Sequence, residues 1–527
     1  MRVQYYYIFR RIAIATSLLL VSLPSWSQKL ARVSPESQGV HSADVQVYLD
    51  HLMQLSTTTM HGAMVLRHGK VIAEAYNAPF KAVFSHTLYS ASKTFTAAAV
   101  GLCVGDSLMS VNDQVAQYFL DELPQEYSDT LLSLTVENLL TMQSGLPVRY
   151  TQLRKDSVHW ARALLSQPFL AEPGSLFAYD SMDTYLLSAI VQRVSGKTVH
   201  ELLKERIFGP LQIPKSSWEL SPDSVSCGGW GLYLQLESMA KFGQLLLQNG
   251  RWNGEQLIPE WWVRDMMSQH AQNANGTGYG YQVWMTSMPG VVRIDGAYGQ
   301  HVFIIPEQDM VVAIFQNFLT GSGINPGGDE WMWLCQLMRK VSDTRQPIVA
   351  GQEYKTLQEK SSSYHLPYAG GEALSAKHQS LLSIPTTVSL ADNMLGWERI
   401  VVSQSRERLK LNVTTRNGEN YDIVCGHGQW QTSKIKGQPL IYPDRKFLGQ
   451  CSGIQSSFYV GASYGWYGSS NDDLYVRLHY VNWISSARIH LHFTGNVVSS
   501  VRLRPAYTNK EIEIPILNSY TGKSQKR

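Results

Sequence analysis

The segment Ser90-Ala91-Ser92-Lys93, followed by an apolar run from Thr94 to Val104, places a hydroxyl and an amine one helical turn apart. Residues at i and i+3 share a helix face, so the Lys93 amine can reach the Ser90 oxygen. If burial lowers its pKa, that amine can accept the serine proton. An N-cap serine followed by a solvated lysine is the alternative interpretation. The choice between these two interpretations therefore depends on which other motifs the chain contains.

Segments on either side of this motif predict a mixed α+β domain over residues 28–342. Apolar alternation bounded by turn residues predicts strands, and apolar spacing with capping residues predicts helices. The expected strands are 63–66, 71–76, 279–285, 291–294, 301–305 and 310–315, and the expected helices are 181–194, 236–247 and 331–341. Because strands lie at both ends, the first and last strands are expected to share one antiparallel sheet.

The chain changes character towards its C-terminal end. Residues 343–371 lack sustained periodicity and are interpreted as a linker. Residues 372–517 alternate apolar and polar side chains between turns, which predicts an all-β sandwich or barrel. Residues 518–527 are expected to form a flexible tail.

Residues 1–27 are typical of a secretory leader. A basic stretch precedes the apolar run over 12–23, and Ser25-Trp26-Ser27 offers a cleavage site. The run is shorter than the ~20 residues that span a bilayer. We therefore expect a periplasmic or secreted protein with no membrane span once the leader is removed.

Charge and cysteine content narrow the function classes. The formal net charge of +3 comes from Arg2, Arg10 and Arg11 in the leader, and without them the 42 remaining basic residues equal the 42 acidic ones. A neutral chain without a basic patch lacks the electrostatics of nucleic-acid binding. Five cysteines are too few for a disulfide framework. If one bridge forms, Cys425 and Cys451 in the strand-rich part are the expected pair.

Three segments, read in order, resemble motifs of the serine β-lactamase and penicillin-binding-protein family. They are residues 88–95 around Ser90 and Lys93, residues 177–181 around Tyr179, and residues 296–300. Further likeness lies at 139–146, 231–233, 239–243 and 250–254. The resemblance covers roughly residues 30 to 340 and implies a β-lactamase-like domain, with helices on both sides of an antiparallel sheet and a helical subdomain.

The resemblance implies roles for individual residues. Ser90 is the acylated nucleophile, Lys93 the proton acceptor or electrostatic activator, and Tyr179 the general base and acid. Free tyrosine titrates near 10, and the lysine cation is expected to lower the pKa of Tyr179. Backbone N–H groups of Ser90 and Gln300 are expected to form the oxyanion hole, with Gly299 leaving space for the substrate. Ser181 and Tyr298 are expected to lie at the substrate as well.

Two departures from the family pattern bear on the substrate. Ser181 stands where the class C pattern has Asn, which is closer to the 6-aminohexanoate-dimer hydrolase and esterase branch. The third motif, usually Lys-Thr-Gly, is assigned to Ala297-Tyr298-Gly299 and lacks the cation that would pair with a substrate carboxylate. No Ser-Asp-Asn motif is present. Neutral esters or amides are therefore favoured over penicillins.

Other chemically suggestive residues have simpler explanations. Ser463 lies in a Gly-x-Ser-x-Gly pattern, but a strand-like segment rather than a helix follows it. His490 and His492 alternate along one strand face without recognisable further ligands, so no metal is expected. His301 lies beside the third motif and is interpreted as a packed strand residue.

The leading hypothesis is an exported serine hydrolase that cleaves a small ester, amide or peptide through an acyl-enzyme on Ser90. Lys93 and Tyr179 act as its acid and base partners, and no cofactor is expected. One alternative is a β-lactamase or D-amino-peptidase of the same family. The other is a non-hydrolytic binding or sensor protein on this scaffold, against which the intact Ser90, Lys93 and Tyr179 argue. The oligomeric state is left open.

Overall fold

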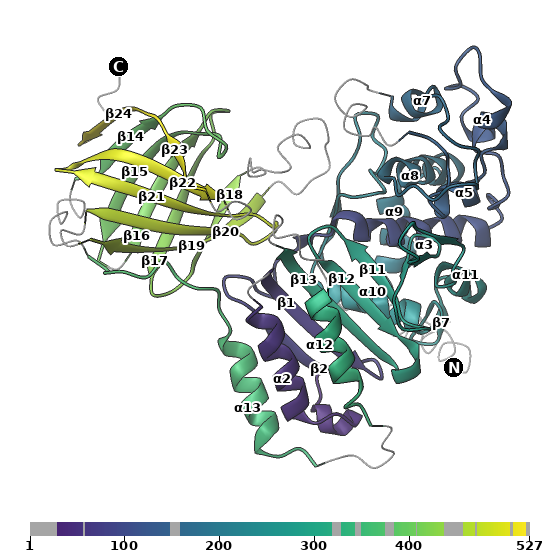
Figure 1. Cartoon of the computed structure of the whole chain (residues 1–527), viewed down its shortest axis with the longest axis horizontal. Coiled ribbons are helices and arrows are strands. Elements are labelled where there is room, and N and C mark those ends of the chain that lie inside the picture. Colours follow the sequence, from purple (N-terminus) through teal and green to yellow (C-terminus); the bar gives the residue numbers. More distant parts are fainter. Residues whose placement is uncertain are drawn as a thin grey trace, which may run out of the picture.

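The computed structural model describes residues 29–55, 58–147, 159–318, 328–342, 349–374, 384–406, 408–436, 457–468, 472–505 and 510–522. The leader assigned to residues 1–27 and Cys451 lie outside these residues. The chain forms a mixed helix-and-sheet part followed by an all-β part (Figure 1). The expected fold class is confirmed. None of the helices in the described ranges has the length and apolar character needed to cross a membrane.

The first part is built on an eight-stranded antiparallel sheet of order β2-β1-β13-β12-β11-β10-β9-β8. Strand β1 (Thr58–Arg67) pairs with β13 (Met310–Phe318), so the first and last strands are neighbours, as the sequence predicts. The other strands are β2 (Lys70–Tyr76), β8 (Ala271–Gln272), β9 (Gly278–Tyr279), β10 (Trp284–Met285), β11 (Val292–Gly296) and β12 (Gln300–Ile305). Residues 279–285 are thus two short strands rather than one, because the chain turns at Gln282, whose φ is +61°.

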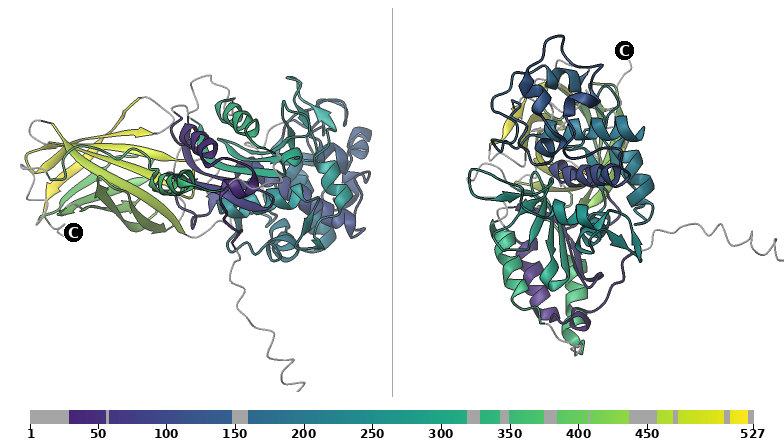
Figure 2. Two further views of the ribbon diagram at one scale, coloured as in Figure 1. Left: turned by 90° about the horizontal axis from the view of Figure 1, so that it is seen from below. Right: turned by 90° about the vertical axis from the view of Figure 1, so that its right-hand side faces the viewer.

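Helices cover both faces of this sheet (Figure 2). On one face α2 (Ser42–Met53) and α12 (Gly328–Met338) bury one apolar cluster. On the other, α10 (Leu236–Leu247) and α3 (Ser92–Gly105) share a second cluster with the helical subdomain. That subdomain contains α4 (Asp129–Ser133), α5 (Val136–Leu140), α7 (Trp160–Leu165), α8 (Ser181–Ser195) and α9 (Val199–Leu203). The active-site candidates lie where α3, α8 and the sheet meet.

The sequence itself marks both ends of α8, with Asp180 or Ser181 as the expected N-cap and Gly196 as the expected stop. The Asp180 carboxylate accepts a hydrogen bond of 2.9 Å from the Met182 N–H, which caps the helix N-terminus. Gly196 ends the helix in the left-handed conformation, with φ +71°. Because both ends are defined locally, the position of Tyr179 just before the helix is defined too.

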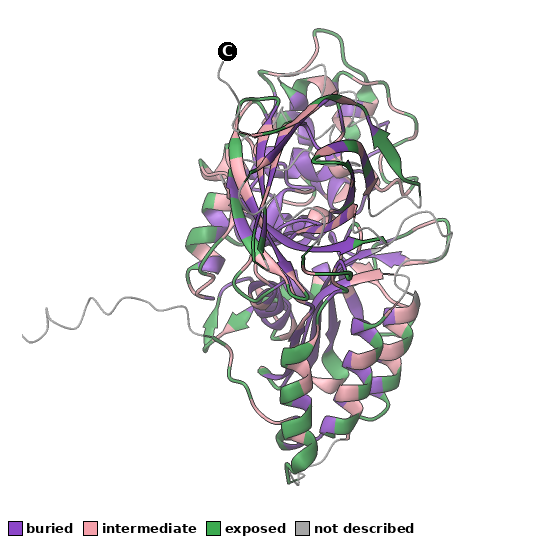
Figure 3. Ribbon diagram, turned by 90° about the vertical axis from the view of Figure 1, so that its left-hand side faces the viewer, coloured by how far each residue is buried: buried purple, intermediate pink, exposed green. Residues whose placement is uncertain are grey.

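The all-β part is one curled sheet of order β23-β22-β21-β20-β19-β17-β16-β15-β14-β24, with β18 paired to β19. Its ends approach each other, since the Val498 N–H on β22 donates to Ser519 Oγ on β24 at 3.0 Å. Figure 3 looks onto this part and shows buried residues on the inside of a ring of strands. The strands are β14 (Thr386–Leu390), β15 (Trp397–Ser405), β16 (Arg408–Thr415), β17 (Asn420–His427), β18 (Gln431–Lys436), β19 (Ser457–Tyr467), β20 (Asp473–Tyr480), β21 (Ser486–Thr494), β22 (Val497–Pro505), β23 (Ile512–Ile514) and β24 (Ile516–Thr521).

Two expectations about flanking segments are wrong. The segment interpreted as a linker contains helix α13 (Gln352–Ser363), which packs on α2 through the Lys360–Asp50 ion pair. With only Leu357 fully buried in it, α13 carries too little apolar periodicity to be recognised. The expected tail begins inside β24, which pairs with β14 over residues 516–521. The side chains of β24 are mostly polar and lack apolar alternation, so its sequence does not predict a strand. Backbone hydrogen bonds hold the strand in the sheet.

Candidate active site

The nucleophile candidate Ser90 lies in the short helical turn Tyr89–Ala91, directly before α3. Tyr89 has φ +48°, a conformation that is uncommon for residues with a side chain. The end of β11 lies against this turn, because a Cβ at Gly296 would collide with the Leu88 carbonyl oxygen. Such local strain is typical of functional turns. The turn therefore presents Ser90 between α3 and the end of β11.

The Lys93 amine is held beside the serine by three acceptors. Its Nζ donates to Ser90 Oγ at 3.1 Å, to Ser181 Oγ at 2.9 Å and to the Gly229 carbonyl at 2.9 Å. The side chain is 1% exposed. Ser181, which the sequence placed among the substrate contacts, thus positions the lysine. The i, i+3 spacing predicted the contact between Lys93 and Ser90, whereas only the tertiary structure shows that the Gly229 carbonyl is an acceptor.

The electrostatic environment makes Lys93 a base near neutral pH. Burial lowers the pKa of Lys93 to about 7, although the charges of Asp180, Asp183 and Asp295 act in the opposite direction. Loss of hydration disfavours the charged amine, and this effect outweighs the three carboxylates. A lysine with such a pKa is neutral for a large share of the time at pH 7 and can accept a proton.

Tyr179 lies beside the same pair, with Lys93 Nζ 4.7 Å from the centre of its ring. Burial raises the pKa of Tyr179 above its ordinary value, although a hydrogen bond with Ser90 acts in the opposite direction. The expectation that the lysine cation lowers this pKa is therefore wrong. Desolvation of a buried phenolate dominates, and Lys93 has itself lost part of its charge. Tyr179 is present as the neutral phenol.

Aromatic side chains line the site beyond Tyr179. Its ring lies 5.4 Å from that of Trp284 and 6.1 Å from that of Tyr279. Phe177 makes edge contacts with the same two rings. These residues pack on the buried Met142. The wall is apolar, so it suits an uncharged group of a substrate.

The third motif was expected at residues 297–299, with Gly299 beside the substrate, but it is Gly296 that lies at the nucleophile turn. Gly296, at the end of β11, contacts the nucleophile turn, whereas Gly299 lies against the Gln316 side chain, which leaves no room for a Cβ. Gly299 has φ +97°, so this contact and its conformation explain the glycine without a substrate. Gln300 is fully buried, and its Nε2 donates to the Gln316 carbonyl at 2.7 Å. Tyr298 makes an edge contact with Tyr89, 5.3 Å between ring centres.

Charged residues near this motif face away from Ser90. Val292 and Ile294 of β11 face the α3 side of the sheet, so Arg293 and Asp295 between them face the α12 side. Arg293 pairs with Asp295 at 2.5 Å. His301 bonds to Glu330 of α12 and, although burial acts against this, the charges of Glu330 and Asp295 raise its pKa to about 9. As expected, His301 is a packed residue rather than a substrate contact.

The all-β part reaches the nucleophile turn, which the sequence did not predict. Its loop 481–485, between β20 and β21, donates from Asn482 Nδ2 to the Ser85 carbonyl at 2.6 Å and accepts at Asn482 O from the Thr87 N–H at 3.1 Å. Trp483 in this loop packs 5.9 Å from the Tyr89 ring. Trp483 thus supports the strained residue that precedes Ser90.

Trp483 should act as a positioning residue. We expect Trp483→Ala to lower kcat/KM about 10- to 100-fold, because a misplaced nucleophile loses reactivity steeply. Trp483→Phe should restore most of the activity, since a ring can still contact Tyr89. Ester kinetics and the labelling rate of Ser90 by a fluorophosphonate measure the effect. An unchanged labelling rate in a folded Trp483→Ala protein would contradict this role.

Two further candidates lie in the all-β part. Ser463 is fully buried inside β19, where its Oγ accepts from the Ala369 N–H at 3.0 Å, so it is not placed as a nucleophile. His490 and His492 do have a third potential ligand. Asp473 on β20 lies opposite His492, and donor atoms of the three side chains lie within 4.8 Å of one another. Such a set could hold a divalent cation, and only strand pairing reveals it.

Fold and site together define a serine hydrolase. The beta-lactamase family model matches residues 49–332, and since this match spans more than half of the chain, the protein belongs to that family. The chain is 24% identical over 290 residues to the 6-aminohexanoate-dimer hydrolase of Paenarthrobacter ureafaciens, an alignment covering 49% of this chain and 73% of that protein. Over 198 residues it is 26% identical to a beta-lactamase of Yersinia enterocolitica, covering 37% and 47% of the two chains. The octameric penicillin-binding protein homologue from Pyrococcus abyssi is 15% identical, covers 90% of this chain and 99% of its own, and has a TM-score of 0.46.

Proposed function

We propose that the protein is an exported serine hydrolase that cleaves an ester or amide bond through an acyl-enzyme on Ser90. One observation carries the proposal: the buried Lys93 amine lies 3.1 Å from Ser90 Oγ and has a pKa of about 7. A nucleophile with an adjacent neutral base is the arrangement that acyl transfer requires. A binding protein that had lost catalysis would have no need for a lysine with this pKa.

In the proposed reaction, neutral Lys93 takes the proton of Ser90 as Oγ attacks the substrate carbonyl carbon. Backbone N–H groups of Ser90 and Ala297, the residue that follows Gly296, are the candidate donors to the resulting oxyanion. We favour Ala297 over Gln300 because Gly296 is the residue that contacts the nucleophile turn. The tetrahedral intermediate then collapses and expels the alcohol or amine.

Tyr179 moves protons in this scheme as a neutral phenol. It is hydrogen-bonded to Ser90, so its hydroxyl can donate to the leaving group while it receives the proton held by Lys93. In the second half, water loses a proton along the same path and attacks the acyl carbon. Ser90 then regains its hydrogen, and the enzyme returns to its starting state.

The surroundings support a neutral acyl group as substrate. The wall around Tyr179 is aromatic, and Arg293 faces the opposite side of the sheet in an ion pair with Asp295. The relative named 6-aminohexanoate-dimer hydrolase supports an amide among the candidate bonds. The β-lactamase alternative is supported by the Yersinia relative. We place esters and amides first because the carboxylate of a β-lactam would lack a cation here.

Intact-protein mass spectrometry tests the proposal. After exposure to a fluorophosphonate we expect one adduct, mapped to Ser90 and absent from Ser90→Ala. A penicillin adduct at the same residue would favour the β-lactamase or peptidase alternative. No adduct with either reagent would favour the non-catalytic alternative. In protein recovered from its source organism, the same spectrum reports whether residues 1–27 are removed, as export requires.

A further inference from the structure

Two histidines and one aspartate lie together on the outer face of the all-β part. Asp473 begins β20, and His490 and His492 lie two residues apart on β21, the neighbouring strand. Successive residues of a strand point to opposite faces. Leu474 and Leu491, the neighbours of these polar residues along the two strands, are buried in the core of this part, so the polar side chains point outwards. We name the three residues the Asp-His-His cluster.

The donor atoms of the Asp-His-His cluster face one another. Asp473 Oδ1 lies 2.7 Å from His490 Nε2 and 2.7 Å from His492 Nδ1. One donor atom from each side chain lies within 4.8 Å of the other two. In a tetrahedral zinc site the donor atoms lie roughly 3.3 Å apart, since each is about 2.1 Å from the metal. Small side-chain rotations therefore suffice to arrange all three around one cation.

Packing defines the orientation of His490. Its ring stacks on that of Tyr475, with ring centres 4.3 Å apart and an angle of 5° between the planes. Tyr475 is directly opposite His490 on β20 and makes an edge contact with Tyr467 on β19. The His490 side chain is 11% exposed, whereas those of Asp473 and His492 are 29% and 44% exposed. One ligand is thus held in place before binding, and solvent reaches the other two.

The charges around the Asp-His-His cluster favour a cation. Asp473 supplies a negative charge within the cluster itself. Arg502 on β22 is directly opposite His490, but Glu513 on β23 is directly opposite Arg502, and both are exposed. Opposite charges across neighbouring strands attract each other. Glu513 therefore offsets the repulsion that Arg502 exerts on a cation.

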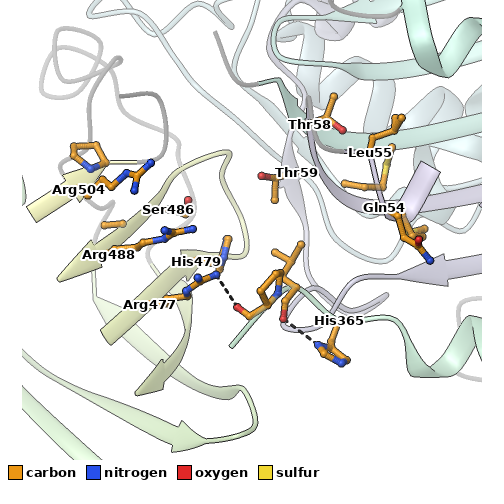
Figure 4. A pocket seen from close by; sticks show the side chains of 16 residues that line it. Gln54, Leu55, Thr58, Thr59, His365, Arg477, His479, Ser486, Arg488 and Arg504 are labelled. Carbon is orange, nitrogen blue, oxygen red and sulfur yellow. Dashed lines mark hydrogen bonds between the residues drawn. The ribbon is translucent and has the colours of Figure 1, made fainter. Parts of the chain in front are cut away.

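The Asp-His-His cluster lies far from Ser90 along β20. Asp473 is the first residue of this strand, whereas the loop 481–485 that contacts the nucleophile turn follows its last residue. About 25 Å of strand separate the two ends. Between them, Arg477 and Arg488 line a cavity that lies between the two parts of the protein (Figure 4). A cation at the cluster would therefore join β20 to β21 without contacting the catalytic residues.

We propose that Asp473, His490 and His492 bind a divalent transition-metal cation such as zinc, with water as a further ligand. Imidazole nitrogens and a carboxylate oxygen are ligands that zinc accepts in proteins. Magnesium and calcium bind through oxygen ligands, so the two histidines select against them. Each histidine would then carry its hydrogen on the ring nitrogen that faces away from the metal. Because only the paired strands bring the ligands together, the cation stabilises the folded all-β part.

Calorimetric titration of the metal-free full chain with zinc chloride tests this site. We expect one zinc bound per chain at the tightest site, and a higher melting temperature with zinc. His492→Gln should weaken this site about 100-fold or more, because even the loss of a residue that only orients a ligand costs roughly 10- to 100-fold. Asp473→Asn should also weaken it. Both side chains are partly exposed, so both variants should fold.

His365→Gln is the matched control. The His365 ring also stacks on a tyrosine, Tyr368, with ring centres 4.5 Å apart, but it lines the cavity that Arg477 lines (Figure 4). This variant should bind zinc as the parent does. Absence of zinc binding, or equal affinity in the parent and in His492→Gln, would overturn the proposal. Displacement of zinc by an equal concentration of calcium would overturn it too. Ser90→Ala should bind zinc normally, so the test is independent of hydrolysis.

Discussion

Replacing Ser90 by alanine should reduce kcat/KM for a small ester by about 10⁴-fold or more, since removal of a nucleophile leaves only the residual effect of substrate binding and oxyanion stabilisation. The fold should survive, because the hydroxyl is small and its hydrogen bond to Lys93 Nζ, at 3.1 Å, is one of three that the amine makes. Steady-state kinetics and circular dichroism of the purified variant measure the two effects.

Ser463→Ala is the matched control for this experiment. Ser463 has the alternative sequence pattern for a nucleophile but is fully buried inside β19. Its removal should cost about 1 to 3 kcal/mol of stability, because the buried Ala369 N–H loses its acceptor, and leave kcat/KM within twofold. Activity that persisted in Ser90→Ala but vanished in Ser463→Ala would assign catalysis to the all-β part.

Lys93→Met should lower kcat/KM about 10³-fold, because Ser90 loses its base while a side chain of similar length fills the space. In the parent enzyme, kcat/KM should rise with pH through an acid limb near pH 7, the pKa of Lys93, as the amine becomes neutral. The variant should lack this limb. Lys241→Met is the matched control, since Lys241 is also a buried lysine whose pKa burial lowers, but it bonds to the Leu211 carbonyl instead.

The pH dependence of stability gives a second readout for Lys93. The unfolded lysine binds its proton below about 10.4, whereas the folded one does so only below about 7. The unfolded state therefore binds more protons between these values. The free energy of unfolding is accordingly highest above about pH 10 and falls as the pH is lowered to about 7. Chemical denaturation of Lys93→Met should show a smaller change over this interval. An identical dependence in both proteins would mean that Lys93 is not the buried base.

Short-range sequence patterns predict much of this fold. The Ser90 and Lys93 spacing, the Asp180 cap and the Gly196 stop each depend on neighbours within a few residues, and the structure places all of them as predicted. Alternation likewise predicts the strand-rich C-terminal part. These features follow from helix and strand periodicity, which any short segment expresses on its own.

Tertiary structure alone decided the rest, because burial and strand register join residues far apart in the chain. The neutral state of Tyr179 and the lowered pKa of Lys93 come from desolvation, which spacing does not report. The glycine that contacts the nucleophile turn is Gly296 rather than Gly299, and only the packed sheet shows this contact. Helix α13, with one fully buried apolar residue, is stabilised by contact with α2 rather than by its own pattern. Likewise, Arg477, Arg488 and Arg504 lie opposite one another only because β20, β21 and β22 pair in this register.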